Sequence, residues 1–224
     1  MDLLDLIFPK QCINCNSFGE YLCTICTQKI IRHKQICIVC RKTSLYGQTH
    51  EYCQNATALS NIIIATEYKD TVKKALVRVK YGLKYDILKE LIEKTLVSQK
   101  IGTFLHSQQI ELCTEVPMHH FKQNQRGFNQ ALLITKWVEK NYTISYQSIL
   151  QKTHQTNAQM SLKRNERLFN LSNAFQIKNN ADIANKNILL IDDVTTTGTT
   201  LEEAATTLKK AGAKNIIALV IANG

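Results

Sequence analysis

Seven of the eight cysteines lie between residues 12 and 53, and most of them form pairs separated by two residues. A Cys-x₂-Cys pair places two sulfurs on one tight backbone turn, and two such pairs supply four ligands for a tetrahedral zinc ion. A site of this kind can fold a segment that has little apolar core of its own. The spacing therefore predicts an N-terminal unit that is folded around zinc.

The metal ligands divide into two successive sets, one of four thiolates and one of three thiolates and an imidazole. The predicted ligands are Cys12, Cys15, Cys23 and Cys26 in the first set and Cys37, Cys40, His50 and Cys53 in the second. One or two zinc ions, an interleaved pairing between the sets, and a redox role for a single pair are the open alternatives. Cys113, alone on a predicted strand, is expected to be an apolar core residue.

After residue 57 the pattern changes to alternating strands and helices. Strands are predicted over 62–68, 110–116, 144–150, 175–177, 188–191 and 216–221, and helices over 71–80, 87–97 and 130–138. This alternation predicts an α/β fold with a mostly parallel, doubly wound sheet. We therefore expect a zinc-ribbon domain over residues 1–57 and an α/β domain over residues 58–224.

The strongest ligand-binding signal lies between residues 187 and 200, where a buried strand leads through two aspartates and a threonine-rich turn into a helix. Backbone N–H groups at a helix start, the helix dipole and threonine hydroxyls all suit a phosphate. The two acids suit a ribose diol or hydrated Mg²⁺. An ordinary strand-to-helix turn is the alternative. The predicted ligand residues are Asp192, Asp193, Thr195, Thr196, Thr197, Gly198, Thr199 and Thr200.

A second strand, ending at Pro117, leads into a polar loop that contains Lys122, Arg126 and Gly127. A guanidinium presents a planar set of donors that suits pyrophosphate, and the lysine adds a point charge nearby. The glycine allows the backbone to turn at the start of the next helix. The alternative is a surface loop in which Asn129 or a neighbour caps that helix.

The net charge of +10 is concentrated in the middle of the chain. Residues 58–110 carry 9 basic and 5 acidic side chains and residues 111–180 carry 9 and 4, whereas residues 181–224 carry 4 and 5. This excess favours a polyanionic partner such as nucleic acid, although a solubilising surface is the alternative. The cations predicted to contact DNA are Lys73, Lys74, Arg78, Lys80, Lys163, Arg164 and Arg167.

The strand, the Asp-Asp pair and the Thr/Gly loop resemble the phosphoribosyl pyrophosphate (PRPP) signature of type I phosphoribosyltransferases. That resemblance implies that the acids hold the ribose hydroxyls and the loop binds the 5′-phosphate, although Thr195 stands where the family usually has an aliphatic residue. Nearly the whole chain resembles the competence protein ComF family, through motifs that include the zinc pairs, Lys80-Tyr-Gly, Val116-Pro, Arg126-Gly-Phe-Asn-Gln130, Gln159-x-x-Leu, Arg167-x-x-Asn170 and the Asp-Asp loop. His50 and Ala56 stand where that family has cysteines.

The ComF resemblance implies a double zinc ribbon joined to a phosphoribosyltransferase-like domain. It further implies a DNA-uptake factor that handles single-stranded DNA beside a competence DNA translocase or helicase, with Mg²⁺-bound PRPP or a related ligand in the cradle. The alternatives are an active phosphoribosyltransferase with an unidentified acceptor and a zinc unit that serves only for docking. No signal peptide or stretch of roughly 20 apolar residues is found, so we expect a cytoplasmic protein, either free or held at the inner membrane through partners.

Overall fold

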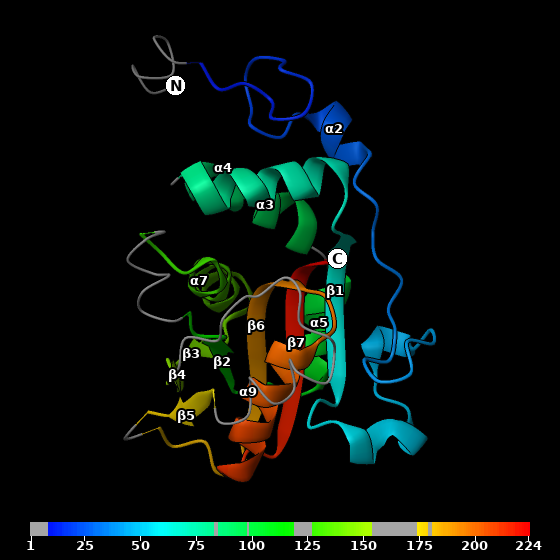
Figure 1. Cartoon of the computed structure of the whole chain (residues 1–224), viewed down its shortest axis with the longest axis vertical. Helices are drawn as coiled ribbons and strands as arrows, with labels where there is room; N and C mark the ends of the chain where they lie inside the picture. Colours follow the sequence, from blue (N-terminus) through cyan, green and yellow to red (C-terminus); the bar gives the residue numbers. More distant parts are fainter. Residues whose placement is uncertain (1–8, 83–84, 98, 119–126, 154–173, 179–180) are drawn as a thin grey trace.

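A five-stranded sheet, parallel throughout, forms the centre of the molecule, with the strand order β1-β7-β6-β2-β3 (Figure 1). The computed structural model describes residues 9–82, 85–97, 99–118, 127–153, 174–178 and 181–224. The strands are β1 (Asn61–Glu67), β2 (Leu112–Glu115), β3 (Ser145–Tyr146), β6 (Asn187–Thr195) and β7 (Asn215–Asn223). The predicted α/β class with a mostly parallel sheet is confirmed.

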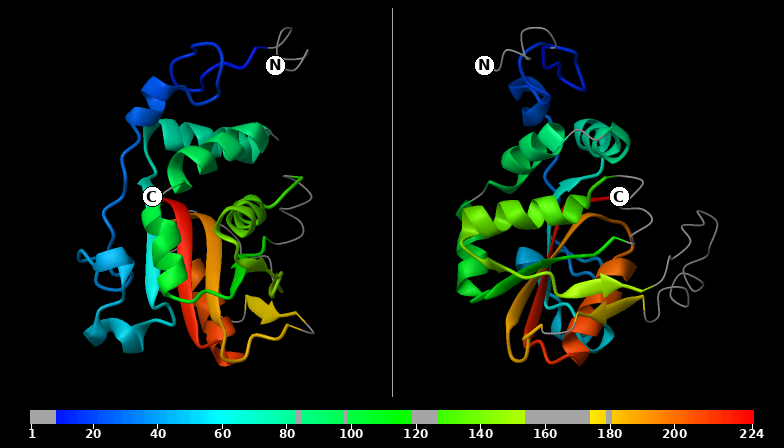
Figure 2. Two further views of the ribbon diagram at one scale, coloured as in Figure 1. Left: turned by 180° about the vertical axis from the view of Figure 1, so that it is seen from behind. Right: turned by 90° about the vertical axis from the view of Figure 1, so that its left-hand side faces the viewer.

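Helices cover both faces of this sheet (Figure 2). The helices are α3 (Asp70–Gly82), α4 (Tyr85–Leu96), α5 (Gln99–Ser107), α7 (Gln130–Tyr142) and α9 (Thr199–Lys210). Successive residues of a strand point to opposite faces. In β6, Leu189 and Ile191 therefore pack with α3, α4, α5 and α7, whereas Ile188 and Leu190 pack with α9. Burial on both faces explains why the central strands are continuously apolar.

One helix was not predicted, because α5 has a glycine near its middle. Glycine costs about 1 kcal/mol relative to alanine inside a helix. Here the missing Cβ makes room for an aromatic ring, since a Cβ on Gly102 would lie 3.1 Å from a ring carbon of Tyr142. Tertiary packing thus offsets a local preference that the sequence pattern reflects.

A second, two-stranded antiparallel sheet pairs β4 (Leu150–Lys152) with β5 (Phe175–Ile177). Leu150 and Phe175 are buried in the same core cluster as α9. The extended segment predicted over 144–150 is thereby divided between β3 in the main sheet and β4 in the small one. This small sheet stands next to the carboxyl end of β2, where a pocket opens.

The central strand β6 continues to Thr195, four residues beyond the predicted apolar run. The extension pairs with β7, with Asp192 opposite Val220 and Thr195 opposite Asn223. At the other end of the strand, the Asn187 side chain donates hydrogen bonds to the carbonyl oxygens of residues 108 and 109, over 3.3 and 3.1 Å. Both ends of β6 are therefore held by neighbouring parts of the fold.

The N-terminal segment contains two ribbons of the same local geometry, the first over residues 12–26 and the second over residues 37–53. It also contains the short helices α2 (Thr24–Gln28), η1 (Leu45–Gly47) and η2 (Glu51–Ala56). In the first ribbon, Asn16 has φ 63° and its N–H donates to the Cys12 carbonyl over 2.8 Å. In the second, Arg41 has φ 62° and donates in the same way to Cys37 over 3.0 Å. The first ribbon lies beside α3 and α4, and the second lies beside β1 (Figure 1).

Candidate functional site

The two acids lie near the carboxyl edge of the sheet, where ligands bind in open parallel sheets. Asp192 and Asp193 follow each other on the last part of β6, and their side chains are close enough to interact. The charge of Lys152 acts on Asp192, and the charge of Asp193 helps burial to raise the pKa of Tyr68. A ligand bound at the end of β6 would therefore meet two adjacent carboxylates.

Burial raises the pKa of Asp192 well above the usual aspartate range, and the negative charge of Asp193 raises it further. Lys152 opposes this rise. The ligand-free site thus disfavours two adjacent negative charges, and a bound cation would relieve that repulsion. This is the electrostatic setting that suits a Mg²⁺-bound ligand.

The loop after the acids forms a turn at the start of α9. Gly198 adopts φ +83°, a conformation that favours glycine, and its carbonyl accepts the N–H of Glu202 over 2.9 Å. The Thr197 and Thr199 hydroxyls lie 2.6 Å apart. In the described part of the chain, the N–H groups of Thr197 and Gly198 have no intramolecular acceptor. These two donors and the positive end of the α9 dipole make the loop a suitable anion site.

The second predicted loop is described only where it meets α7. Gly127 adopts φ +73°, as its predicted turning role requires. Asn129 caps α7, because its Oδ1 accepts the Ala131 N–H over 3.0 Å. Its Nδ2 donates to the Val116 carbonyl over 3.1 Å and joins the helix start to β2. The other predicted loop and DNA contacts, Lys122, Arg126, Lys163, Arg164 and Arg167, lie outside the described residues.

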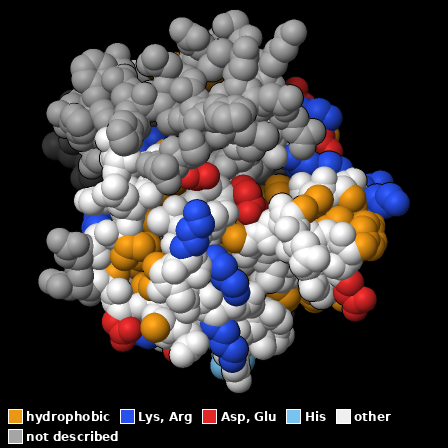
Figure 3. Space-filling view, turned by 60° about the horizontal axis from the view of Figure 1, so that its bottom comes forward, with side chains coloured by type: hydrophobic (Ala, Val, Ile, Leu, Met, Phe, Trp, Pro, Cys, Tyr) orange, Lys and Arg blue, Asp and Glu red, His pale blue; other side chains and the backbone are white. Residues whose placement is uncertain are grey.

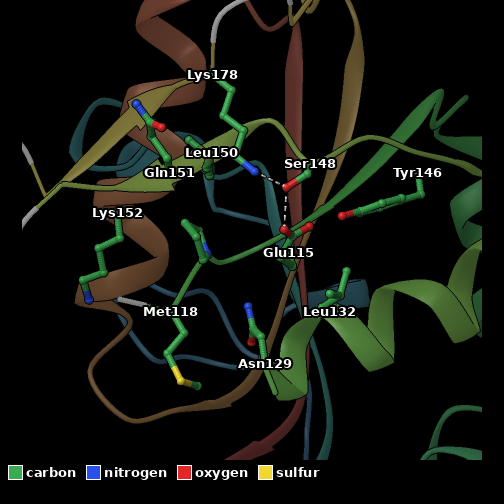
Figure 4. Close-up of a pocket in the computed structure, with 11 residues that line it drawn as sticks. Glu115, Met118, Asn129, Leu132, Tyr146, Ser148, Leu150, Gln151, Lys152 and Lys178 are labelled. Carbon is green, nitrogen blue, oxygen red and sulfur yellow. Dashed lines mark hydrogen bonds between the residues drawn. The ribbon is translucent and has the colours of Figure 1, made fainter. Parts of the chain in front are cut away.

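A pocket of about 340 Å³ lies between the end of β2, the start of α7 and the small sheet. Figure 4 shows a chain of three polar side chains on its wall. Lys178 Nζ donates to Ser148 Oγ over 2.6 Å, and Ser148 Oγ donates to Glu115 Oε1 over 2.7 Å. Glu115 is only 6% exposed, and its Oε2 has no hydrogen-bond partner among the residues that the structure describes. The pocket adjoins the acid pair, because Glu115 is paired with Ile191 in the sheet.

Sequence reasoning did not identify this pocket. Glu115 stood in a correctly predicted strand, and a carboxylate inside an apolar run is a usable signal. Ser148 and Lys178 carried no comparable signal, because they come from two segments that only the folded chain brings together.

Cations line the exposed half of α3. Lys73, Lys74 and Arg78 are exposed and Lys80 is half-buried, while the other half of the helix packs into the core. Lys74 Nζ also donates to Asn14 Oδ1 over 2.8 Å, which links the helix to the first ribbon. Figure 3 shows that another face carries a line of Lys and Arg side chains with acidic side chains beside it. Cations on that face can therefore serve as controls for the predicted DNA surface.

Both predicted metal clusters are assembled without interleaving. Within each set the ligand atoms all lie within 4.8 Å of one another. Cys15 and Cys23 Sγ are 3.6 Å apart, and Cys40 Sγ lies 3.2 Å from His50 Nδ1. Zinc–sulfur bonds of roughly 2.3 Å require tetrahedral neighbours about 3.8 Å apart, so both donor sets fit zinc. Cys113 is fully buried as predicted, and burial raises its pKa to about 12.

Comparisons with known proteins match both parts of the chain. The double zinc ribbon domain family matches residues 3–57, and the phosphoribosyl transferase domain family matches residues 138–224. None of the described helices is long and apolar enough to cross a bilayer.

Three curated relatives align along most of the chain. Competence protein F of Haemophilus influenzae is 27% identical over 220 residues, which cover 93% of this chain and 95% of that protein. Competence protein ComFC of Streptococcus pneumoniae is 28% identical over 199 residues, with coverage of 87% and 84%. DNA utilization protein YhgH of Escherichia coli K12 is 23% identical over 218 residues, with coverage of 93% and 94%. Along most of its length the chain is thus similar to competence proteins of the ComF type, and it joins a match to the double zinc ribbon domain to a match to the phosphoribosyl transferase domain.

Proposed function

We propose that this chain is a cytoplasmic DNA-uptake protein that handles single-stranded DNA beside a competence translocase or helicase. It holds Mg²⁺-bound PRPP, or a related sugar phosphate, at the acid pair and the Thr195–Thr200 loop. The relatives named for competence and DNA utilization support the DNA role. The observation that carries the ligand assignment is the acid pair at the carboxyl edge of β6, followed directly by a helix-opening loop with a left-handed Gly198.

Each part of the site has a distinct role in this proposal. A ribose lies at the end of β6, where the adjacent carboxylates of Asp192 and Asp193 accept hydrogen bonds from its hydroxyls. The 5′-phosphate accepts the N–H groups of Thr197 and Gly198 at the start of α9. Mg²⁺ bound with the ligand would supply positive charge that neutralises part of the charge of the pyrophosphate and lowers the raised pKa of Asp192.

Calorimetric titration with PRPP and MgCl₂ tests the ligand assignment. Wild type and the Asp193→Ala variant are compared with Asp182→Ala, whose exposed carboxylate pairs with Lys186 away from the loop. Hydrogen bonds to charged groups contribute about 1.5–3 kcal/mol, so Asp193→Ala should weaken binding by about 10- to 100-fold. Asp182→Ala should bind like wild type. Equal affinity in wild type and Asp193→Ala would remove the acid pair from the ligand site.

DNA binding is tested through its dependence on salt. Each phosphate neutralised on a single strand steepens the slope of log K against log salt by about 0.7. A variant with Lys73, Lys74 and Arg78 all changed to alanine should therefore show a slope shallower by up to about 2. The matched control changes Lys209, Lys210 and Lys214, at the far end of α9, to alanine. Equal losses in both variants would show that α3 is not the DNA surface.

An active phosphoribosyltransferase is the second candidate, and the pocket around Glu115 favours it. Glu115 Oε2 is buried on the pocket wall and has no partner in the described part of the chain, so it can accept a hydrogen bond from the ring N–H of an acceptor base. The assay measures Mg²⁺-dependent release of pyrophosphate from PRPP across a panel of nucleobases. Release that falls in Glu115→Gln would support transfer. No release with any base would leave a ligand-binding domain without turnover.

A further inference from the structure

The two zinc ribbons have the same local geometry but different neighbours. In the first ribbon, Ile13 packs with the core beneath α3 and α4, and Asn14 accepts the Lys74 ammonium. In the second ribbon, Ile38 and Arg41 contact the Thr195–Thr200 loop. The second ribbon is therefore built against the proposed anion site, and the first ribbon has no such contact in the described residues.

Arg41 holds two consecutive carbonyl groups of the loop. Its Nη2 donates to the Thr197 carbonyl over 2.8 Å and to the Thr196 carbonyl over 3.4 Å. In a trans peptide the carbonyl and the following N–H point in opposite directions. Holding these two oxygens therefore turns the N–H groups of Thr197 and Gly198 away from the guanidinium. Among the described residues, neither of these two N–H groups has an intramolecular acceptor.

Further contacts from the second ribbon and from the residues that follow it hold the loop and the start of α9. A Cβ on Gly198 would lie 2.7 Å from Ile38 Cδ1, so that side chain packs directly behind the turn. The N–H of Ala58 donates to Glu202 Oε1 over 2.7 Å, and the Thr57 hydroxyl donates to Oε2 of the same carboxylate. Arg41 directly follows the ligand Cys40, and Thr57 follows η2, which contains the ligand Cys53. The two anchors thus flank the second metal cluster.

We propose that Arg41 is a positioning residue for the anion loop and that the second metal cluster holds it in place. Zinc at Cys37, Cys40, His50 and Cys53 then supports phosphate binding at a loop more than 140 residues away in sequence. The proposal rests on the proposed function, namely that this loop binds a sugar phosphate. By linkage, the ligand must strengthen zinc binding at that cluster by the same factor.

The test measures binding of ribose 5-phosphate and of PRPP with Mg²⁺ by calorimetry. Arg41→Ala is paired with Asn16→Ala, which removes the side chain at the equivalent left-handed position of the first ribbon. Loss of a charged hydrogen-bond donor at an exposed position should weaken both ligands by about tenfold in Arg41→Ala. Asn16→Ala should bind like wild type, and Arg41→Lys should lie between the two, because a lysine has no planar fork for two carbonyls.

A second measurement separates positioning from general stability. Zinc is extracted with a chromophoric chelator, with and without saturating ribose 5-phosphate. Wild type should require more chelator when the ligand is bound, and Arg41→Ala should lose that difference while it still holds zinc at both clusters.

The outcomes separate this proposal from the proposed function. If wild type binds neither sugar phosphate, both fail. If Asp193→Ala weakens binding while Arg41→Ala and Arg41→Lys bind like wild type, only the role of Arg41 is overturned. If Arg41→Ala loses zinc on purification, Arg41→Lys decides: an affinity equal to that of wild type overturns the proposal, and a weaker one supports it.

Discussion

Adding one methyl group at Gly198 should destabilise the folded protein through two separate costs, one from backbone conformation and one from steric contact. The residue has φ +83°, and a side chain in the left-handed region costs about 1–2 kcal/mol. The new Cβ would also lie 2.7 Å from Ile38 Cδ1. Overpacking costs about 1–3 kcal/mol, and the lower end applies here because Cδ1 is the flexible end of its side chain. We therefore expect Gly198→Ala to lose about 2–3 kcal/mol of unfolding free energy.

Gly212→Ala is the matched control for the backbone part. Gly212 has φ +97°, and a Cβ there would meet Ala184 atoms only at 3.6 Å, which is ordinary contact. This variant should lose about 1–2 kcal/mol. The difference between the two variants isolates the contact between the loop and the second ribbon.

Ile38→Val in the Gly198→Ala background should recover most of that difference, because it removes the atom nearest to the new methyl. Unfolding of the zinc-loaded protein by urea, followed by far-UV circular dichroism, gives the four free energies of the cycle. Equal losses in Gly198→Ala and Gly212→Ala, with no recovery in the double variant, would refute packing of the ribbon on the loop.

Three further perturbations have defined outcomes. The folded-state pKa of Asp192 is raised, so the folded protein loses stability as pH rises above about 3.9 and through the folded pKa, where Asp192 ionises. Asp192→Asn should therefore raise the Tm of the ligand-free protein at pH 7 but not at pH 3. An equal effect at both pH values would contradict the electrostatic cause. Cys113, with a pKa of about 12 from burial, should resist iodoacetamide at pH 7 until the chain unfolds, as judged by mass spectrometry. Asn129→Ala removes the α7 cap and should cost about 1 kcal/mol, or about 2–4 °C of Tm by calorimetry, whereas an unchanged Tm would show that water replaces the cap.

Local signals predicted most of the fold, and tertiary pairing accounts for the main differences. The apolar run ending at Ile191 predicted the centre of β6, but its last residues are strand because β7 pairs with them. A run of Asp, Val and Thr residues has no local pattern that predicts pairing with β7. The helix around Gly102 was missed because glycine lowers helix propensity, while the ring of Tyr142 that packs against it lies 40 residues away.

The site was predicted to the extent that its residues are adjacent in sequence. Asp192, Asp193 and the loop form one continuous motif, so their types and order indicated the chemistry directly. The metal ligands were found for the same reason, through their regular spacing. Arg41 was missed because its carbonyl partners lie 155 and 156 residues away, and Glu115 because its partner Ser148 lies on another segment.

The hydrogen bonds of Asn187 have a consequence for specificity. β6 is apolar on both faces from Ile188 to Ile191, so sliding the strand by one residue would still bury apolar side chains but would displace the acid pair. The hydrophobic pattern alone cannot prevent that slip. Asn187 resists it, because its amide would lose both carbonyl acceptors. An uncharged side chain about 16 Å along the strand from Asp192 thus helps to fix the register in which the acid pair reaches the carboxyl edge of the sheet.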